Sequence, residues 1–259
     1  MVGVEIGLDG RRALITGAGQ GIGLGVAKMF AAAGAVVAIN DVVADRAQAA
    51  VDEIVAEGGR AIAAPFDVTD YDGVTAAINE LGGTDILVNN AGNAGTAGWA
   101  GLAKFVDTEP SDWAMYLRVN LDGVMNCVRA ALPSMIEGNW GRIITIVSDA
   151  GRIGESHMAA YCAAKAGAAG LTRAVAREAA RHNVTANNIA LGTMRTPVSE
   201  AMWANPDSPE AKSIMRGYLI RRPGLPDDVA GLALYLASDM ASWITGQTYP
   251  LNGGFSFAL

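Results

Sequence analysis

The sequence predicts an α/β protein: one domain over residues 1–259, built as a doubly wound (Rossmann-type) parallel sheet of about seven strands with helices on both faces. Short β-branched runs alternate with longer segments whose apolar residues recur at helical spacing. The helical segments end at glycines, and the strand runs are almost continuously apolar, as expected for strands covered on both faces. The strand runs are RALIT (12–16), AVVAI (35–39), AIAAP (61–65), DILVNN (85–90), RIITIVS (142–148), VTANNIA (184–190) and QTYPL (247–251).

Composition and charge argue against several classes of protein. The 26 acidic residues outnumber the 19 basic ones, and no block of Lys or Arg occurs, so nucleic acid is not an expected partner. The two cysteines, Cys127 and Cys162, are too few for a disulfide framework, and the two histidines give no metal-ligand spacing, so no metal is expected. The N-terminus lacks a signal-peptide pattern, and no apolar run reaches the roughly 20 residues of a membrane span. We therefore expect a cytoplasmic protein without membrane contact.

The first strand runs into a glycine-rich turn, TGAGQGIG. Gly17, Gly21 and Gly23 have the spacing G-x-x-x-G-x-G, with Gln20 and Ile22 between them. Glycines let the backbone turn tightly and approach a pyrophosphate, which free N–H groups and the positive end of the helix dipole would hold. An ordinary strand-to-helix turn is the alternative. No GK[ST] follows, so a P-loop is excluded, and the turn predicts a dinucleotide site.

An acidic residue, Asp41, follows the second strand. It can accept hydrogen bonds from the adenosine ribose and would repel a 2′-phosphate, and Gln20 offers that phosphate no charge, so NAD is favoured over NADP. Arg46 is the opposite signal, but its place in the following helix predicts that it faces solvent. After the third strand, Asp67 and Val68 are expected beside the adenine. The alternative is that Asp67 belongs to a helix N-terminus.

The fifth strand ends at Ser148, and the next helical segment contains YCAAK, with Tyr161 and Lys165 four residues apart. Residues at this spacing share a helix face with Cβ atoms about 5–6 Å apart. A tyrosine that acts as a base near pH 7 needs its pKa lowered by roughly 3 units, worth about 4 kcal/mol. An ammonium at about 5 Å supplies roughly 3 kcal/mol at an effective dielectric near 20. The spacing therefore predicts an acid/base, Tyr161, whose pKa Lys165 lowers.

Each of these residues also has a structural explanation when taken alone. A helical tyrosine is usually a core residue, a lysine is usually solvated, and Ser148 can cap a helix. Their joint spacing favours function. His157, Cys127 and Cys162 have no partner that would make any of them a ligand or nucleophile.

These motifs together resemble the short-chain dehydrogenase/reductase family over nearly the whole chain. TGAGQGIG is similar to its cofactor loop, NNAG (89–92) to its fourth-strand motif, and Ser148, 13 residues before Y-x-x-x-K, to its catalytic set. LRVNLDGV and ITGQTYPLNGG also match. The resemblance implies hydride transfer with a nicotinamide cofactor, in which Tyr161 moves the proton and Ser148 donates a hydrogen bond to the substrate oxygen. Lys165 would hold the nicotinamide ribose, and Asn120 would hold a water that connects Lys165 to solvent.

The resemblance adds further cofactor contacts and one departure. Thr196 is expected to contact the nicotinamide carboxamide. Leu191 stands where the family usually has proline, which leaves the path of that loop open. The remaining expected contacts are Asn90, Ala91, Gly92 and Gly192.

The segment 196–224, rich in Pro, Met and Trp, predicts a helical lid inserted over the substrate site. With Trp99, the residues Met194, Met202 and Trp203 would line an apolar pocket. Arg152 can meet a carboxylate or a carrier phosphate of the substrate, or form a surface salt bridge. The expected substrate is an apolar secondary alcohol or ketone: an alicyclic alcohol, a steroid-like ring or a 3-hydroxyacyl thioester.

The sequence thus predicts an NAD(H)-dependent oxidoreductase that interconverts a secondary alcohol and a ketone. A non-catalytic dinucleotide sensor is one alternative, although a sensor needs no catalytic set. An isomerase or dehydratase that uses NAD transiently is another. The helices around 110–137 and 158–182 carry Ala and Gly at helical spacing, and the family resemblance implies that they pair across a dimer axis within a homotetramer.

Overall fold

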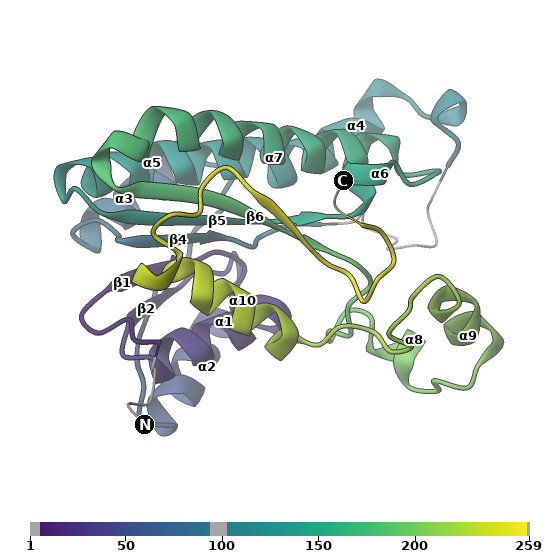
Figure 1. Cartoon of the computed structure of the whole chain (residues 1–259), viewed down its shortest axis with the longest axis horizontal. Helices are drawn as coiled ribbons and strands as arrows, with labels where there is room; N and C mark the ends of the chain where they lie inside the picture. Colours follow the sequence, from purple (N-terminus) through teal and green to yellow (C-terminus); the bar gives the residue numbers. More distant parts are fainter. Residues whose placement is uncertain (1–5, 94–102, 258–259) are drawn as a thin grey trace.

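A seven-stranded parallel sheet with the order β3-β2-β1-β4-β5-β6-β7 forms the centre of the computed structural model, which describes residues 6–93 and 103–257 (Figure 1). Every run predicted to be a strand overlaps one, so the doubly wound sheet is confirmed. The strands are β1 (Arg12–Ile15), β2 (Val36–Ile39), β3 (Arg60–Ala63), β4 (Ile86–Asn89), β5 (Gly141–Ser148), β6 (Val184–Leu191) and β7 (Thr248–Leu251).

Helices cover both faces of this sheet, and each face has its own core (Figure 1). Successive strand residues point to opposite faces, so Ile15 packs with Phe30 under one helical layer while Leu14 packs with Val128 under the other. One layer consists of α1 (Gly21–Ala32), α2 (Ala44–Ala56) and α10 (Pro226–Ala237). The other contains α3 (Tyr71–Glu80), α5 (Gly123–Glu137) and α7 (Ala159–Ala179).

The sheet reverses its winding direction between β1 and β4. The chain passes from β3 at one edge back to β4, which pairs with the other side of β1. Connections therefore leave these two neighbouring strands toward opposite faces, and a crevice opens at their carboxyl ends, where doubly wound folds bind ligands.

The helix predicted around 110–137 is interrupted. It comprises α4 (Pro110–Leu117), a π-helical turn η3 (Arg118–Asp122) and α5. Such turns insert an extra residue and frequently occur at functional sites. Asn120 lies within η3 and is fully buried. The interruption thus turns a predicted site residue into the interior.

The segment 196–224, here termed the lid segment, contains α8 (Glu200–Trp203) and α9 (Pro209–Met215) and projects from the sheet (Figure 1). It has a small core of its own, formed by Trp203, Ala211, Met215 and Tyr218.

The remaining short elements are η2 (Phe105–Asp107), α6 (Ala150–Ile153), η4 (Ala180–His182) and η5 (Asp239–Ala241). None of the helices in the described part of the chain has the length and hydropathy of a membrane span.

Candidate active site

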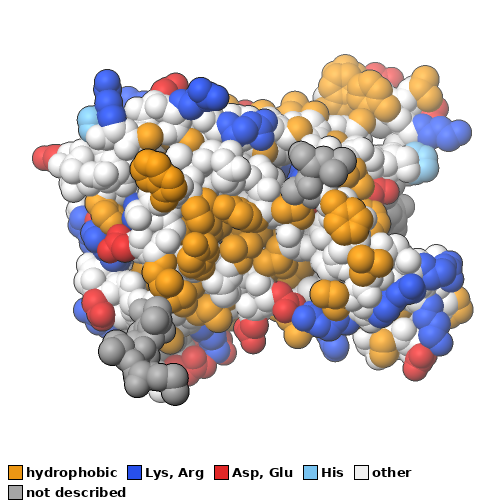
Figure 2. Space-filling view, viewed as in Figure 1, with side chains coloured by type: hydrophobic (Ala, Val, Ile, Leu, Met, Phe, Trp, Pro, Cys, Tyr) orange, Lys and Arg blue, Asp and Glu red, His pale blue; other side chains and the backbone are white. Residues whose placement is uncertain are grey.

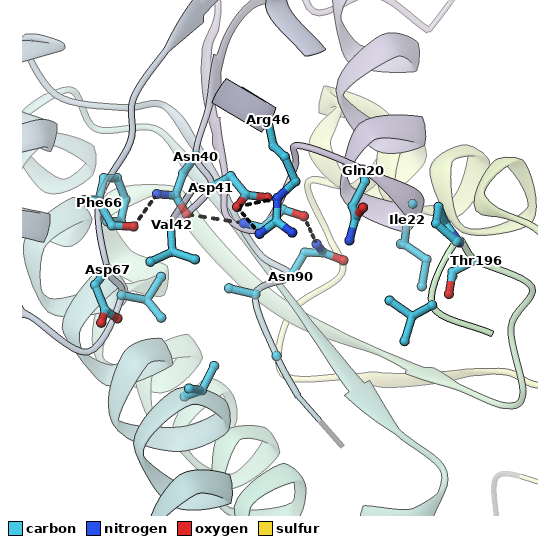
Figure 3. Close-up of a pocket in the computed structure, with 18 residues that line it drawn as sticks. Gln20, Ile22, Asn40, Asp41, Val42, Arg46, Phe66, Asp67, Asn90 and Thr196 are labelled. Atoms are coloured by element: carbon cyan, nitrogen blue, oxygen red, sulfur yellow. Dashed lines mark hydrogen bonds and ion pairs between the residues drawn. The ribbon is translucent and has the colours of Figure 1, made fainter. Parts of the chain in front are cut away.

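A cavity of about 410 Å³ lies at the carboxyl ends of β1, β2, β3 and β4 (Figure 3). The predicted residues that line it are Gly17, Gln20, Gly21, Ile22, Asp41, Asp67, Val68, Asn90, Ala91, Gly92 and Thr196. It is also lined by Asn40, Val42, Arg46, Phe66, Val119, Pro197 and Val198. Val42 and Phe66 are apolar lining residues that were not predicted, and their place shortly after β2 and β3 is the signal that could have found them.

The glycine turn holds its shape through backbone conformations that glycine favours. Gly17 and Gly21 both have φ of +61°, in the left-handed region, and α1 begins at Gly21 without a side-chain cap on its first N–H groups. Gly23 does not line the cavity. A Cβ at Gly23 would lie 2.6 Å from Asn90 Nδ2, so this glycine lets α1 approach the end of β4.

The end of β4 is bonded to the glycine turn. Asn90 Nδ2 donates to the carbonyl oxygens of Thr16 (2.9 Å) and Gly17 (3.0 Å), and the Asn90 N–H donates to Thr16 Oγ1 (3.0 Å). Asn90 therefore fixes the wall of the cavity. A Cβ at Gly92 would lie 2.8 Å from Asn120 Oδ1 and 3.2 Å from Lys165 Nζ, so Gly92 is where the cavity meets the predicted catalytic residues.

Lys165 is buried on α7 beneath the end of β5. Its Nζ donates to the carbonyl oxygen of Ile146 (3.0 Å) and lies 5.9 Å from the centre of the Tyr161 ring. Burial disfavours the ammonium and lowers the pKa of Lys165 to about 8. Tyr161 and Lys165 thus share one face of α7, as the four-residue spacing predicts.

The environment of Tyr161 differs from the prediction. Burial raises the pKa of its phenol, the hydrogen bond with Ser148 lowers that pKa, and Cys162 raises it. The pKa of Tyr161 is therefore raised overall, whereas the sequence predicts a lowered one, and the Lys165 ammonium is directed to a backbone carbonyl. Tyr116 packs edge-on against the Tyr161 ring at 6.4 Å. In this arrangement Ser148 is the group that favours the phenolate.

Asn120 is held by hydrogen bonds on each side of its amide. Nδ2 donates to the carbonyl oxygens of Asn93 and Tyr116 (both 3.0 Å), and Oδ1 accepts from the Asn93 N–H (3.2 Å). The structure thus brings Ser148, Tyr161, Lys165 and Asn120 together beside Gly92.

Comparison with known proteins decides the family. The model of the family described as enoyl-(acyl carrier protein) reductase matches residues 17–256. The chain is 38% identical over 256 residues to the oxidoreductase UcpA of Salmonella typhimurium, covering 95% of each protein. The chain belongs to the short-chain dehydrogenase/reductase family.

Other relatives in this family have named activities. The 3-oxoacyl-[acyl-carrier-protein] reductase FabG of Staphylococcus aureus is 37% identical, over 94% of this chain and 97% of its own. The 7alpha-hydroxysteroid dehydrogenase of Escherichia coli is 37% identical, over 95% of this chain and 94% of its own. The structure of a gluconate 5-dehydrogenase from Burkholderia cenocepacia in complex with NADP and tartrate superimposes with a TM-score of 0.89, at 36% identity and 98% coverage of both chains. This chain is an oxidoreductase of the same family.

The nicotinamide dinucleotide that the family uses fits these residues. The left-handed glycines, the uncapped start of α1 and the absence of a side chain at Gly92 leave backbone N–H groups and space along the cavity. Gly192 does not line the cavity. It packs against Asn252 and Tyr218.

Arg46 adds an ion pair that was not predicted beside Asp41 in this short-chain dehydrogenase/reductase. Its Nη2 lies 2.7 Å and its Nε 3.2 Å from Asp41 Oδ1, and it lines the cavity (Figure 3). Its side chain is 43% exposed, so it faces solvent as predicted, and the salt bridge to Asp41 is the feature that the sequence did not predict. The charge of Asp41 is therefore partly offset, and a guanidinium stands in the cavity wall. Gly19, which was not predicted, permits this approach: its Cβ would lie 2.6 Å from Asp41 Oδ2.

The predicted substrate residues do not line this cavity. Trp203 is 2% exposed and belongs to the core of the lid segment, with Met202 packed against it, since two short helices need an apolar core of their own. Met194 packs against the core beneath α10 and pairs with Gly224. Trp99 lies outside the described residues.

Arg152 and Leu191 also have defined places. Arg152 Nη1 bonds to Asp149 Oδ1 (2.6 Å) and Ser256 Oγ (2.9 Å), so it forms an internal salt bridge rather than a contact in the cavity. Leu191 is the last residue of β6, paired with Ser148 on β5 and Leu251 on β7. The departure from proline thus leaves the strand regular to its end.

Proposed function

We propose that this protein is an NAD(H)-dependent oxidoreductase that interconverts a secondary alcohol and a ketone. The observation that carries the proposal is the convergence of Ser148, Tyr161, Lys165 and Asn120 beside the cavity that the glycine turn lines. A protein that only senses dinucleotides needs no such set. Acid/base and hydrogen-bonding groups beside a hydride carrier suit alcohol–ketone chemistry.

Each side chain has a separate role in the proposed reaction. The bound nicotinamide supplies the hydride donor or acceptor. Tyr161 takes the proton of the alcohol during oxidation and returns it to the ketone oxygen during reduction, while Ser148 donates a hydrogen bond to the same oxygen. Lys165, whose pKa is lowered to about 8 by burial, can exchange a proton near neutral pH, and the buried amide of Asn120 lies next to it. These residues therefore bind, orient and move a proton at the substrate oxygen.

Asp41 supports NAD as the preferred cofactor. Its Oδ1 is occupied by Arg46 and by the Val43 N–H (3.0 Å), while Oδ2 points toward the glycine turn and can accept from ribose hydroxyls. A 2′-phosphate would meet both the carboxylate and the guanidinium. We therefore propose a preference for NAD that rests on the charge of Asp41 alone.

Replacement of Asp41 by asparagine tests this preference. Removing one charge about 5 Å from a 2′-phosphate changes the interaction by roughly 3 kcal/mol at an effective dielectric near 20, so NADP should bind on the order of 100-fold more tightly. Fluorescence titration with NADP and with NAD measures both affinities. Asp45→Asn, an exposed neighbour, is the matched control, and Arg46→Gln in the Asp41→Asn background should remove the gain. Unchanged NADP affinity in Asp41→Asn would contradict the role of Asp41.

The proposed substrate class is an apolar secondary alcohol or ketone: an alicyclic alcohol, a steroid-like ring or a 3-hydroxyacyl thioester. Relatives at 37% identity that act on a 3-oxoacyl carrier and on a hydroxysteroid support this range. The test is a screen of secondary alcohols and ketones with both cofactors, following reduced nicotinamide. Cofactor binding without turnover would favour the sensor, and turnover without net change in reduced nicotinamide would favour an isomerase or dehydratase.

We further propose a cytoplasmic homotetramer. Ala159, Ala163 and Ala166 are exposed small residues along α7, which permits close helix contact. Apolar side chains also gather over β7 and α10 (Figure 2), where β7 is an edge strand whose residues are half-buried. Light scattering at micromolar concentration should give four times the mass of the chain. A monomer would contradict the proposal.

A further inference from the structure

A buried polar cluster lies directly after the catalytic serine. We define the Asp149 cluster as Asp149, Arg152, Asn252 and Ser256. Asp149 is 3% and Asn252 8% exposed, although their side chains are polar. Asp149 Oδ2 accepts from Ser256 Oγ (2.9 Å) and Asn252 Nδ2, and Oδ1 accepts from Arg152 Nη1 (2.6 Å). The buried carboxylate is thus fully paired, as its desolvation requires.

The cluster joins three strand ends. Asp149 follows Ser148, the last residue of β5, and its N–H donates to the carbonyl oxygen of Leu191 at the end of β6 (3.0 Å). Asn252 and Ser256 belong to the segment after β7, here termed the tail (252–257). Arg152 Nη2 donates to the Phe257 carbonyl (3.0 Å), which adds a second link to the tail. Hydrogen bonds to the end of β6 and to the tail therefore hold Asp149, the residue after the catalytic serine.

The tail also contacts the lid segment. The rings of Tyr218 and Phe255 stack with centroids 4.9 Å apart, and the Ile220 N–H donates to the Gly253 carbonyl (2.9 Å). Tail, lid segment and the turn after β5 thus form one connected unit.

We propose that the Asp149 cluster is a positioning device that holds the turn after β5 so that the Ser148 hydroxyl bonds to Tyr161. None of its four side chains lines the cavity, and none belongs to the catalytic set. Its members act through Ser148, because Asp149 is covalently next to it and its other contacts fix the direction of the turn. This inference rests on the proposed function.

The state of Tyr161 reports on the position of Ser148. The groups that face its phenol are Ser148 from β5, Lys165 and Cys162 on α7, and Tyr116 from α4. Among the causes of its shifted pKa, the hydrogen bond with Ser148 is the one that lowers it. Displacing Ser148 should therefore raise the pKa of Tyr161 and move the pH profile of kcat to higher pH.

Asn252→Ala and Ser256→Ala test the proposal, since each removes one donor to Asp149 and keeps Arg152 as its partner. Ser256→Ala also removes a hydrogen-bond acceptor of Arg152. Each should lower kcat at pH 7 about tenfold, the effect of weakening one hydrogen bond to a charged group, with the Kd for NAD within about twofold. In the Ser148→Ala background the same substitutions should change kcat by less than about twofold, because residues that act through one group are not additive. Arg12→Gln is the control: it removes an exposed pair with Asp85 at the opposite end of the sheet, and should leave the pH profile unchanged.

A second readout needs no turnover. The near-ultraviolet absorbance of tyrosinate, taken as the difference from Tyr161→Phe in each background, should titrate at higher pH in both tail variants. Effects on kcat that add to those of Ser148→Ala, or an unshifted Tyr161 titration, would overturn the positioning role. A wild-type protein that turns over none of the screened alcohols or ketones would instead count against the proposed function, while the titration still decides the positioning role.

Discussion

Tyr161→Phe is expected to lower kcat by about 10³-fold, within the range of 10²- to 10⁴-fold that positioned acid/base groups supply. The phenol is the only group of the catalytic set proposed to exchange a proton with the substrate oxygen. Steady-state kinetics with the best substrate from the screen measures the loss, and titration of the cofactor should give an unchanged Kd. Tyr71→Phe, an exposed tyrosine at the start of α3, is the matched control. A Tyr161→Phe variant that keeps most of its activity would remove the catalytic assignment.

Lys165→Met is expected to abolish most activity and yet to stabilise the fold at neutral pH. The folded pKa of Lys165 is about 8, below its ordinary 10.5, so the folded state disfavours the ammonium. Below pH 8 the wild-type protein therefore carries the full penalty of a buried charge, and Met removes it. After allowance for the lost bond to the Ile146 carbonyl, the net gain in free energy of unfolding is about 1–3 kcal/mol.

The lowered pKa of Lys165 fixes the direction in which this stability difference changes with pH. Between pH 8 and 10.5 the unfolded chain binds a proton at Lys165 that the folded chain does not, so wild-type stability rises with pH in that window. The advantage of Lys165→Met should therefore be largest at pH 7 and shrink as pH rises toward 10. Urea unfolding at pH 7 and pH 9.5 measures it. If Lys165→Met lowered the free energy of unfolding by the same amount at both pH values, burial would not penalise the ammonium.

The loss of activity and the gain in stability expected for Lys165→Met both follow from the place of Lys165 in the fold. The proposed role of Lys165 places an amine in the sheet–helix interface, where the burial that lowers its pKa also makes the ammonium costly to the fold. Functional sites commonly carry such a conflict between activity and stability.

Local sequence patterns predicted the fold and pointed to the proposed catalytic set. Strand runs such as DILVNN and RIITIVS predicted β4 and β5 because strands buried on both faces are apolar throughout. The four-residue spacing of Tyr161 and Lys165 placed both on one helix face, since helical geometry is a property of the backbone. The glycine turn was likewise predictable, because only glycine adopts its left-handed conformations readily.

Contacts between distant segments were not predictable from the same patterns. Trp203 was expected in a pocket and lies in a core, because sequence shows that a side chain is apolar and not which surface it covers. The Asp149–Asn252 contact joins residues 103 positions apart. The π-helical turn at Asn120 was also not predicted, because the helical periodicity of the segment carries no signal for it.

The sequence by itself thus determined the parallel sheet and its glycine turn, and it identified the residues proposed to exchange protons and hydrogen bonds. These depend on periodicity and on short-range spacing, which the chain specifies locally. Only the tertiary structure decided that Arg46 bonds to Asp41, that burial raises the pKa of Tyr161 while Ser148 lowers it, and that the tail bonds to the residue after β5. These depend on the distances and burial of groups that meet only when the chain is folded.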